Sequence, residues 1–206
     1  MIVTVRRLGG LLLDFEQALA SDSLRAQSAA ALFLRSEGAL GSIHLEQLLS
    51  RCQSVDLQLH ELPTQEENLV TYGALSAASI VNAVGYNDDD TLHRSVVQWI
   101  IGLTRNRHIK VAGTSIHAIA IVGIPPSETR KCLEDLIQTD RRPDDFELIT
   151  CRGTAFRCLA AIDRQLAFPY LDTPACRDHI ALVSHWLGER PNDRQFIDEL
   201  TWMQAK

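Results

Sequence analysis

Aromatic residues are scarce in this chain of 206 amino acids. Phe, Trp and Tyr together make up 6% of it, whereas alanine and leucine supply much of the apolar content. A β-sandwich usually needs more aromatic and β-branched side chains, and alanine and leucine are among the strongest helix formers. The composition therefore favours close-packed helices and predicts an all-α fold.

Paired cysteines are missing as well. The five cysteines are scattered, and none forms the CxxC pair that zinc ribbons and redox motifs use. They are Cys52, Cys132, Cys151, Cys158 and Cys176. We expect small buried hydrophobic side chains in a reducing cytoplasm, with no metal site and no cofactor.

Long apolar runs are absent too. No segment approaches the ~18 apolar residues that a membrane-spanning helix needs. The apolar run over residues 8–13 is closed by Asp14, whereas a secretory signal peptide has a longer core and a small-residue cleavage site. We therefore expect a soluble, cytoplasmic protein with no membrane partner.

Basic residues are fewer than acidic residues in this chain. The chain has 20 Lys and Arg residues against 26 Asp and Glu residues, which gives a formal net charge of −6. A protein that grips duplex DNA normally needs a basic face to replace the counterions on phosphate. The charge therefore argues against nucleic acid as a partner and fits a basic protein better.

What the sequence does contain is a glycine that recurs at a fixed step. Gly73, Gly113 and Gly153 stand forty residues apart, each inside a segment whose apolar residues have helical spacing. A period of this size predicts stacked helical hairpins. Glycine inside a helix costs about 1 kcal/mol against alanine. We therefore expect these glycines, with Ser28 as their counterpart in the first hairpin, to let adjacent helices approach closely.

Helical spacing of apolar residues continues along the whole chain, and the segments are joined by short connections. It predicts ten helices and no strand, with the first helix over residues 8–20 and another that runs to about Ala167. Consecutive helices should pair as antiparallel neighbours. The five resulting hairpins lie near residues 8–36, 41–85, 88–123, 126–167 and 175–205.

The second helix of the first hairpin reads DSLRAQSAAAL over residues 22–32. This resembles the inner helix of HEAT repeats, in which Asp and a Val-Arg pair precede two small residues and an Ala-Leu. Residues 109–114 follow the pattern with Lys110 in place of arginine, and residues 69–74 and 149–154 follow it without the basic residue. The final hairpin departs from the pattern, as terminal repeats that cap a stack often do.

The resemblance implies a single HEAT-like α-solenoid domain over residues 1–206, an α–α superhelix of about five helical hairpins. The second helices of such stacks usually line a concave face that binds partners. Side chains of these helices that avoid the stripe of leucine, glycine and isoleucine should point outward. The candidates for partner binding are Arg25, Thr71, Asn82, Lys110, His117, Arg152 and Arg157, of which His117 and Arg157 are forty residues apart.

No catalytic motif stands out. The chain lacks GxGxxG, P-loop and GxSxG sequences. His-Glu occurs once, at 60–61, whereas iron-binding HEAT-like hydroxylases use several such dipeptides. The acidic run 88–90 is best explained as capping of the following helix. The spacing of Cys158, Asp178 and His179 does not favour a thiol site.

These observations favour a protein that binds another protein and is not an enzyme. One hypothesis is an immunity or antitoxin-type inhibitor that occludes a basic partner, and a general assembly scaffold would use the same surface. The alternative from another class is a HEAT-like DNA-binding enzyme of the alkylpurine glycosylase kind. Basic residues near 105–110 and 141–142 would serve it, but Asp140, Asp144 and Asp145 oppose the second cluster.

Overall fold

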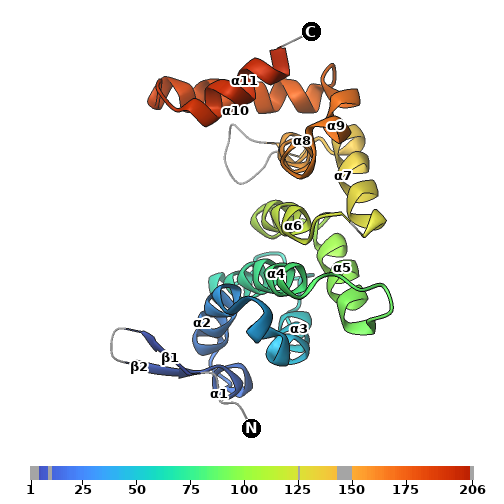
Figure 1. Ribbon diagram of the computed structural model, residues 1–206. Helices are drawn as coiled ribbons and strands as arrows, with labels where there is room; N and C mark the ends of the chain where they lie inside the picture. The colour runs from blue at the N-terminus through green and yellow to red at the C-terminus, as the bar shows by residue number, and fades with distance from the viewer. Residues whose placement is uncertain (1–4, 9–10, 125, 143–149, 205–206) are drawn as a thin grey trace. The chain divides into compact units, whose positions relative to one another are not determined.

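A computed structural model describes residues 5–8, 11–124, 126–142 and 150–204 of the chain. The elements form two compact units, which we name unit 1 (residues 1–126) and unit 2 (residues 127–206). Each unit is described by itself, and one continuous domain stays a prediction. Apart from one short hairpin, every element of the described chain is helical, which confirms the all-α class (Figure 1).

The described chain begins with a two-stranded antiparallel hairpin. Strand β1 spans Val5–Leu8 and strand β2 spans Leu11–Asp14. The predicted helix over residues 8–20 is therefore wrong in its first half. The physical reason is the glycine pair at positions 9–10, because glycine is a poor helix former and a two-glycine spacing between short apolar runs is typical of a hairpin.

Unit 1 holds six α-helices and one 3-10 helix in its described part. They are α1 Phe15–Ala20, α2 Leu24–Leu34, the 3-10 helix η1 Arg35–His44, α3 Leu45–Gln53, α4 Thr64–Val84, α5 Thr91–Leu103 and α6 Ile109–Val122. Consecutive helices pair as α1 with α2, α3 with α4 and α5 with α6. The second members of these pairs lie side by side in a row, with α4 between α2 and α6 (Figure 1).

Residues at the helix ends explain these bounds. Side chains of Ser23 and Asp90 accept hydrogen bonds from N–H groups in the first turns of α2 and α5, which have no partner inside the helix. Gly85 and Gly123 follow α4 and α6 with φ angles of 83° and 82°. Glycine adopts this conformation without a Cβ clash and ends helices for that reason. The lengths of the helices in the row are therefore encoded locally.

Small side chains hold the row of α2, α4 and α6 together. Ala31 of α2, Ala74 of α4 and Ala112 of α6 are all fully buried. The hydroxyl of Ser76 in α4 donates a hydrogen bond to the backbone oxygen of Ala31 in α2. Because alanine and serine have short side chains, the helix backbones approach closely and are fixed in position.

Unit 2 holds five α-helices and one 3-10 helix in its described part. They are α7 Ser127–Thr139, α8 Cys151–Ile162, α9 Arg164–Ala167, the 3-10 helix η2 Phe168–Tyr170, α10 Pro174–Glu189 and α11 Arg194–Gln204. Helix α8 packs against both α7 and α10, and α11 packs against α10. Since α9 is a single turn, ten longer α-helices remain in the described chain, as predicted.

The helix predicted to run to about Ala167 is interrupted. Helix α8 ends at Ile162, and Asp163 has an extended backbone. The carboxylate of Asp163 accepts a hydrogen bond from the backbone N–H of Gln165 at 2.8 Å, so it caps the start of α9. Residues 143–149, where the start of the predicted helix falls, lie outside the described residues.

Gly73 and Gly153 of the glycine step lie where helices approach closely. A Cβ on Gly73 of α4 would collide with Sγ of Cys52 in α3. A Cβ on Gly153 of α8 would lie 3.2 Å from Cβ of Asp178 in α10, which is tighter than ordinary contact. The predicted packing role is confirmed there. However, Gly73 of α4 faces α3, its own hairpin partner, whereas Gly153 of α8 faces α10, which belongs to the next hairpin.

Aromatic rings pack between the helices of unit 2. Phe156 of α8 is fully buried, and its ring centroid lies 6.0 Å from that of His179 and 6.2 Å from that of Trp202. Trp186 of α10 stacks on Phe196 of α11 with centroids 5.1 Å apart. Wide rigid rings space helices further apart than alanine does, so hollows form between them.

The cysteines are all free, and four of the five are buried, whereas Cys132 is partly exposed. Burial raises the pKa of the Cys52 thiol. The predicted role as buried hydrophobic side chains therefore holds for four of them. No helix of the described chain is both long enough and apolar enough to cross a bilayer, and a cytoplasmic location stays a prediction.

Candidate functional site

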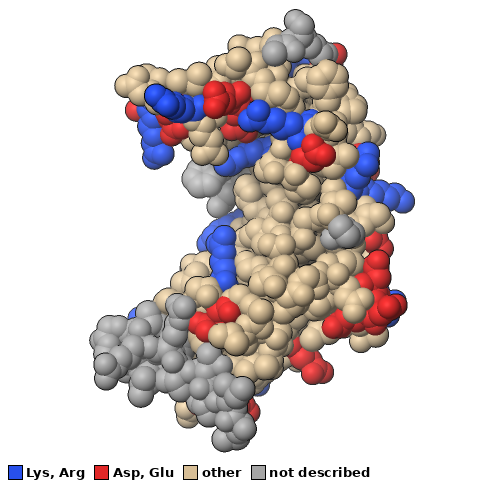
Figure 2. Space-filling view, in the orientation of Figure 1, with Lys and Arg blue, Asp and Glu red and all other residues tan. Residues whose placement is uncertain are grey.

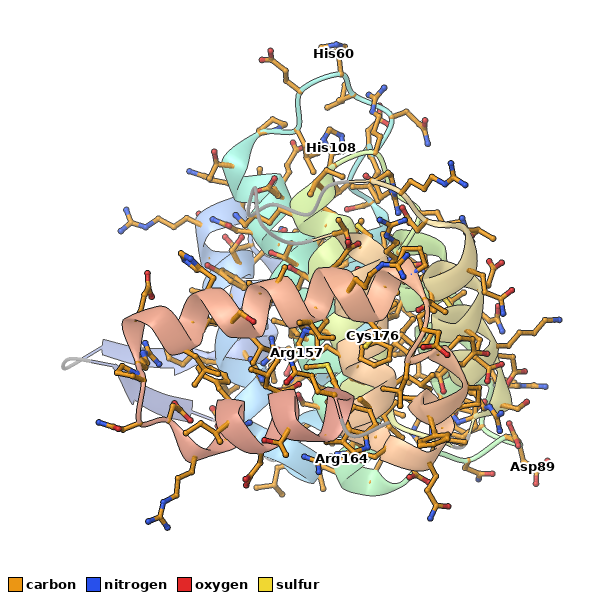
Figure 3. The ribbon with its side chains drawn as sticks, turned by 90° about the horizontal axis from the view of Figure 1, so that it is seen from above. His60, Asp89, His108, Arg157, Arg164 and Cys176 are labelled. Carbon is orange, nitrogen blue, oxygen red and sulfur yellow. The ribbon has the colours of Figure 1, made fainter. Side chains whose placement is uncertain are left out.

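A cleft of about 350 Å³ opens in unit 2 between α8, α9 and α11. Its lining residues are Arg157, Ala160, Ala161 and Arg164 on one side and Gln195, Glu199 and Trp202 on the other. Gln195, Glu199 and Trp202 have i, i+4, i+7 spacing and share one face of α11, whereas Arg157 lies on α8 and Arg164 begins α9. Figure 3 shows Arg157 and Arg164 in the region of α10 and α11.

Both arginines of the cleft stack on tryptophans. The guanidinium carbon of Arg157 lies 5.3 Å from the ring centroid of Trp186, and that of Arg164 lies 5.3 Å from the ring centroid of Trp202. A cation over an indole face gains about 0.5–1 kcal/mol at an exposed site. Stacking uses the flat face of a guanidinium and leaves its N–H groups, which lie at the edge, able to donate to a ligand.

The carboxylate of Glu199 is anchored by a buried histidine. Nε2 of His179 lies 2.6 Å from Oε1 of Glu199, and the side chain of His179 is 1% exposed. An ionised carboxylate only accepts, so the shared proton lies on Nε2. The other ring nitrogen, Nδ1, is buried with no hydrogen-bond partner among the described residues. His179 therefore fixes one oxygen of Glu199 while the Glu199 side chain lines the cleft.

The surrounding charges keep Glu199 ionised. Burial alone raises the pKa of this carboxyl group, but the hydrogen bond and charge of His179 and the charges of Arg157 and Arg164 together lower it below its ordinary value. At neutral pH the cleft therefore presents two cations and one anion. Figure 2 shows basic and acidic side chains next to one another near the top of the view, where Figure 1 draws α10 and α11.

A second hollow of about 280 Å³ adjoins the cleft. It is lined by Arg164, Gln165, Phe168 and Trp202. Phe168 is 58% exposed, which is unusual for a large aromatic ring. Because Arg164 and Trp202 line both hollows, their stacked pair forms the wall between a charged cleft and an apolar one.

The side chains of the two hollows are suited to binding an anionic group next to an apolar one. Arg157 and Arg164 donate hydrogen bonds to anionic oxygens, and the amide of Gln195 both donates and accepts. Phe168 and Trp202 offer flat apolar surface. Together these side chains can hold one anionic group next to one apolar group.

The seven predicted partner-binding residues are divided between the two units and differ in exposure. Arg157 lines the cleft of unit 2. Arg25, Asn82 and His117 are exposed in unit 1, on α2, α4 and α6. These three agree with the predicted outward orientation, and their role in binding stays a prediction.

Thr71 does not point outward. Its side chain is buried, with 3% of its surface exposed, and its hydroxyl donates a hydrogen bond to the backbone oxygen of Glu67 at 2.9 Å. That prediction is wrong because the apolar stripe of α4, which lies between α2 and α6, is wider than a single row of leucine and glycine positions indicates.

Lys110 and Arg152 form ion pairs between neighbouring helices. Nζ of Lys110 in α6 lies 2.6 Å from Oε1 of Glu67 in α4. Nε of Arg152 in α8 lies 2.6 Å from Oδ2 of Asp178 in α10. Each pair links helices within one unit, so both side chains have a structural role.

The forty-residue step does not produce equivalent surfaces. His117 of α6 and Arg157 of α8 both reach solvent, but Ala77 of α4, forty residues earlier, is fully buried. Helix η1 covers this face of α4, where a Cβ on Gly41 would lie 2.9 Å from Cδ1 of Ile80. The long connection between α2 and α3 therefore fills a surface that α6 leaves open.

The basic clusters that favoured a DNA-binding alternative are largely engaged within the chain. Arg130 pairs with Glu134 at 2.8 Å, and Arg142 pairs with Asp140 at 2.6 Å. The guanidinium of Arg107 donates to the backbone oxygen of Gln58. Cations that are already paired release fewer counterions from phosphate, so these residues are poorly placed to bind a nucleic-acid backbone.

The other sequence candidates have structural contacts. Oδ1 of Asp90 accepts a hydrogen bond from the backbone N–H of Leu92 at 2.8 Å, which confirms the capping interpretation of the acidic run. Asp178 pairs with Arg152 and accepts from the hydroxyl of Thr150 at 2.6 Å. In the described ranges, no three His, Cys, Asp or Glu side chains come close enough together to hold a metal ion.

A further hollow of about 360 Å³ lies in unit 1, between α3 and α5. Its polar side chains are the amides of Gln53, Gln58, Gln98 and Asn106, and Trp99 also lines it. Because its lining carries no charged side chain, it lacks the strong electrostatic character of the cleft in unit 2.

Sequence reasoning missed four residues of the cleft, namely Arg164, Gln195, Glu199 and Trp202. A usable signal was present, since Arg157 and Arg164 are two helical turns apart and Gln195, Glu199 and Trp202 have i, i+4, i+7 spacing on one helix. The signal lay on two separate helices, and nothing in the spacing alone shows that these two faces meet.

Comparisons of this chain with protein-family models, with curated proteins and with solved structures found no match. The site must therefore be interpreted from its own geometry.

Proposed function

We propose that this chain is a non-enzymatic protein-binding module that contacts its partner through the cleft of unit 2. The observation that carries the proposal is the pair of arginines stacked on Trp186 and Trp202 next to the exposed ring of Phe168. Arginine and tryptophan are the residues most enriched in the energetic centres of protein interfaces, and aromatic side chains are enriched across them.

Rigidity supports the same proposal. Stacking on the indole rings restricts Arg157 and Arg164 before any partner arrives, and His179 does the same for Glu199. Less side-chain entropy is then lost on association, which favours affinity. A cleft built from ordered side chains on three helices is a better recognition surface than a set of flexible surface charges.

The finer form of the proposal is a HEAT-like solenoid that acts as an inhibitor of a basic protein, of the immunity or antitoxin kind. The net charge of −6 supports long-range attraction of such a partner, and the row of α2, α4 and α6 is the arrangement that stacked hairpins produce. An assembly scaffold would use the same surfaces.

An affinity experiment with the full-length chain tests the proposal. The bait is compared with Arg157→Glu/Arg164→Glu, with Arg177→Glu as a matched control on the exposed surface of α10, and with Arg25→Glu in unit 1. We expect one stoichiometric partner, identified by mass spectrometry and then purified, to bind the control and the Arg25 variant as it binds the unchanged chain. Its affinity for the cleft variant should fall at least tenfold.

Two outcomes would contradict the proposal. If the purified partner binds the cleft variant normally but loses affinity for Arg25→Glu, the interface lies on unit 1. If no protein partner is found and the chain binds duplex DNA with a steep salt dependence, the glycosylase-type alternative replaces protein binding.

A further inference from the structure

The charges of the cleft select for one negative charge. Arg157 and Arg164 contribute two positive charges, and Glu199, held by His179, contributes one negative charge. A ligand with a single carboxylate would be attracted by the guanidinium groups and would leave the cleft close to neutral. A doubly charged phosphate would leave the cleft with a net negative charge, which is less favourable than the neutral state that a single carboxylate gives.

The hydrogen-bonding groups point to the same chemistry. A guanidinium group offers parallel N–H donors whose spacing matches the two oxygens of a carboxylate. Gln195 adds an amide that can contact the backbone of a bound peptide. One guanidinium, that of Arg164, borders both hollows and stacks on Trp202 between them.

The apolar hollow at Phe168 defines what lies next to the carboxylate. A ligand group that covers Phe168 and the adjacent face of Trp202 would remove exposed apolar surface from water, at roughly 25 cal/mol for each Å² buried. Since the two hollows share a wall, neighbouring side chains of one extended peptide can reach both.

We infer that the cleft binds a local acidic segment of a partner protein whose remaining surface is basic, with one Asp or Glu carboxylate between Arg157 and Arg164 and an adjacent apolar side chain against Phe168. This inference rests on the proposed protein-binding function and adds the chemistry of the segment that is recognised.

The test uses the full-length chain and fluorescein-labelled peptides. The probe is a hexapeptide with Glu followed by Leu, flanked by Gly and Ser, and its binding is followed by fluorescence anisotropy. Three control peptides replace Glu by Gln, Glu by phosphoserine, or Leu by Ser. We expect each replacement to weaken binding, by about tenfold for Gln, because a charge-assisted hydrogen bond contributes about 1.5 kcal/mol or more.

Variants of the chain give an independent readout. Arg164→Gln should weaken binding of the Glu-Leu peptide about tenfold, whereas the matched control Arg177→Gln should leave it unchanged. Phe168→Ser, at an exposed position, should remove the preference for Leu over Ser and keep the preference for Glu over Gln. Circular dichroism of each variant checks that the helices are intact.

The inference is overturned if the Gln or phosphoserine peptide binds as well as the Glu peptide, or if Arg164→Gln and Arg177→Gln behave alike. Failure of the proposed function is a different result. In one case the chain prefers the Glu-Leu peptide over the controls as expected, but Arg157→Glu/Arg164→Glu still binds the purified partner. The inferred peptide chemistry is then supported, whereas the role of the cleft in partner binding is contradicted. In the other case Arg157→Glu/Arg164→Glu no longer binds the partner, but the chain binds all four peptides alike. The proposed function is then supported, whereas the inferred peptide chemistry is contradicted.

Discussion

Unit 1 and unit 2 are built from the same kind of helical hairpin but are packed with different side chains. The row of α2, α4 and α6 in unit 1 is packed with alanine, serine and glycine, and Lys110 is paired with Glu67 between two of its helices. The helices of unit 2 are held by Phe156, Trp186 and Trp202, which leave a charged cleft. The two units therefore pack their helices with side chains of different size, and the charged cleft lies in the unit that uses the larger ones.

The first way to test this contrast is to remove the buried histidine of unit 2. His179→Leu removes the hydrogen-bond donor of the half-buried Glu199 and leaves its charge unpaired, and we expect a loss of about 2 kcal/mol in the free energy of unfolding of unit 2. The measurement is denaturant unfolding followed by tryptophan fluorescence in a Trp99→Phe background, so that only Trp186 and Trp202 of unit 2 report.

The control is His179→Leu/Glu199→Leu, which removes both members of the pair. We expect it to recover most of the lost stability, because an apolar pair leaves no buried charge. Equal losses in the single and the double variant would show that His179 acts through packing on Phe156 instead.

The second test adds a methyl group at the close contact between α3 and α4 in unit 1. Gly73→Ala forces Cys52 to move, and we expect a loss of about 2 kcal/mol, from overpacking in a core of small residues. Gly153→Ala in unit 2 should cost less, because its new Cβ would meet atoms at 3.2 Å and needs only a small shift. Thermal unfolding by circular dichroism measures both.

Two companion variants make this test specific. Gly73→Ala/Cys52→Ala should recover stability, since the sulfur no longer occupies the space of the new methyl group. Gly102→Ala in α5, where an added Cβ meets nothing within 4 Å, should stabilise by up to about 1 kcal/mol. A destabilised Gly102→Ala would contradict the packing account.

The third test uses acid. The pKa of Glu199 is lowered in the folded chain, so its ionised form stabilises unit 2 above the ordinary carboxyl value of 4.5, and this contribution is lost as pH falls through the lower folded value. Glu199→Gln should cost about 1 kcal/mol at pH 7 and progressively less below pH 4.5. Unfolding curves of unit 2 between pH 7 and pH 3 measure the difference, and a loss that stays constant with pH would contradict it.

The smallest effect is expected at the ion pair of unit 1. Lys110→Met keeps the apolar stem of the side chain and removes its charge. The side chains of Lys110 and Glu67 are 37% and 21% exposed, so solvent screens the pair and we expect a cost of only about 0.5 kcal/mol. Denaturant unfolding reported by Trp99 measures it, and a loss as large as that of His179→Leu would remove the contrast between the two units.

The sequence predicts the helices well because their ends are set by local chemistry. Ser23 and Asp90 cap helices through their own side chains, and Gly85 ends one with positive φ, so these boundaries can be found without knowledge of the fold. The N-terminal hairpin is harder to predict, because Leu11 and Leu12 also fit helical spacing although the glycine pair before them favours a turn.

The cleft is harder to predict because it depends on contacts between helices. Asp163 ends α8, and α9 then places Arg164 next to the face that carries Arg157. Which face of α11 meets these arginines is decided by the packing of Trp202 on Phe156, and neither residue type nor spacing encodes that choice. Arg157 could therefore be selected from the sequence, whereas Glu199 could not.

The close contact between Gly73 and the sulfur of Cys52 also makes Cys52 a reporter of local unfolding. Its sulfur lies where a Cβ of residue 73 would stand, and Cys52 is 1% exposed, so an alkylating reagent reaches the thiol only after the structure around α3 opens locally. The labelling rate of Cys52, set against that of the partly exposed Cys132 of unit 2, would report how often unit 1 opens while the rest of the chain stays folded.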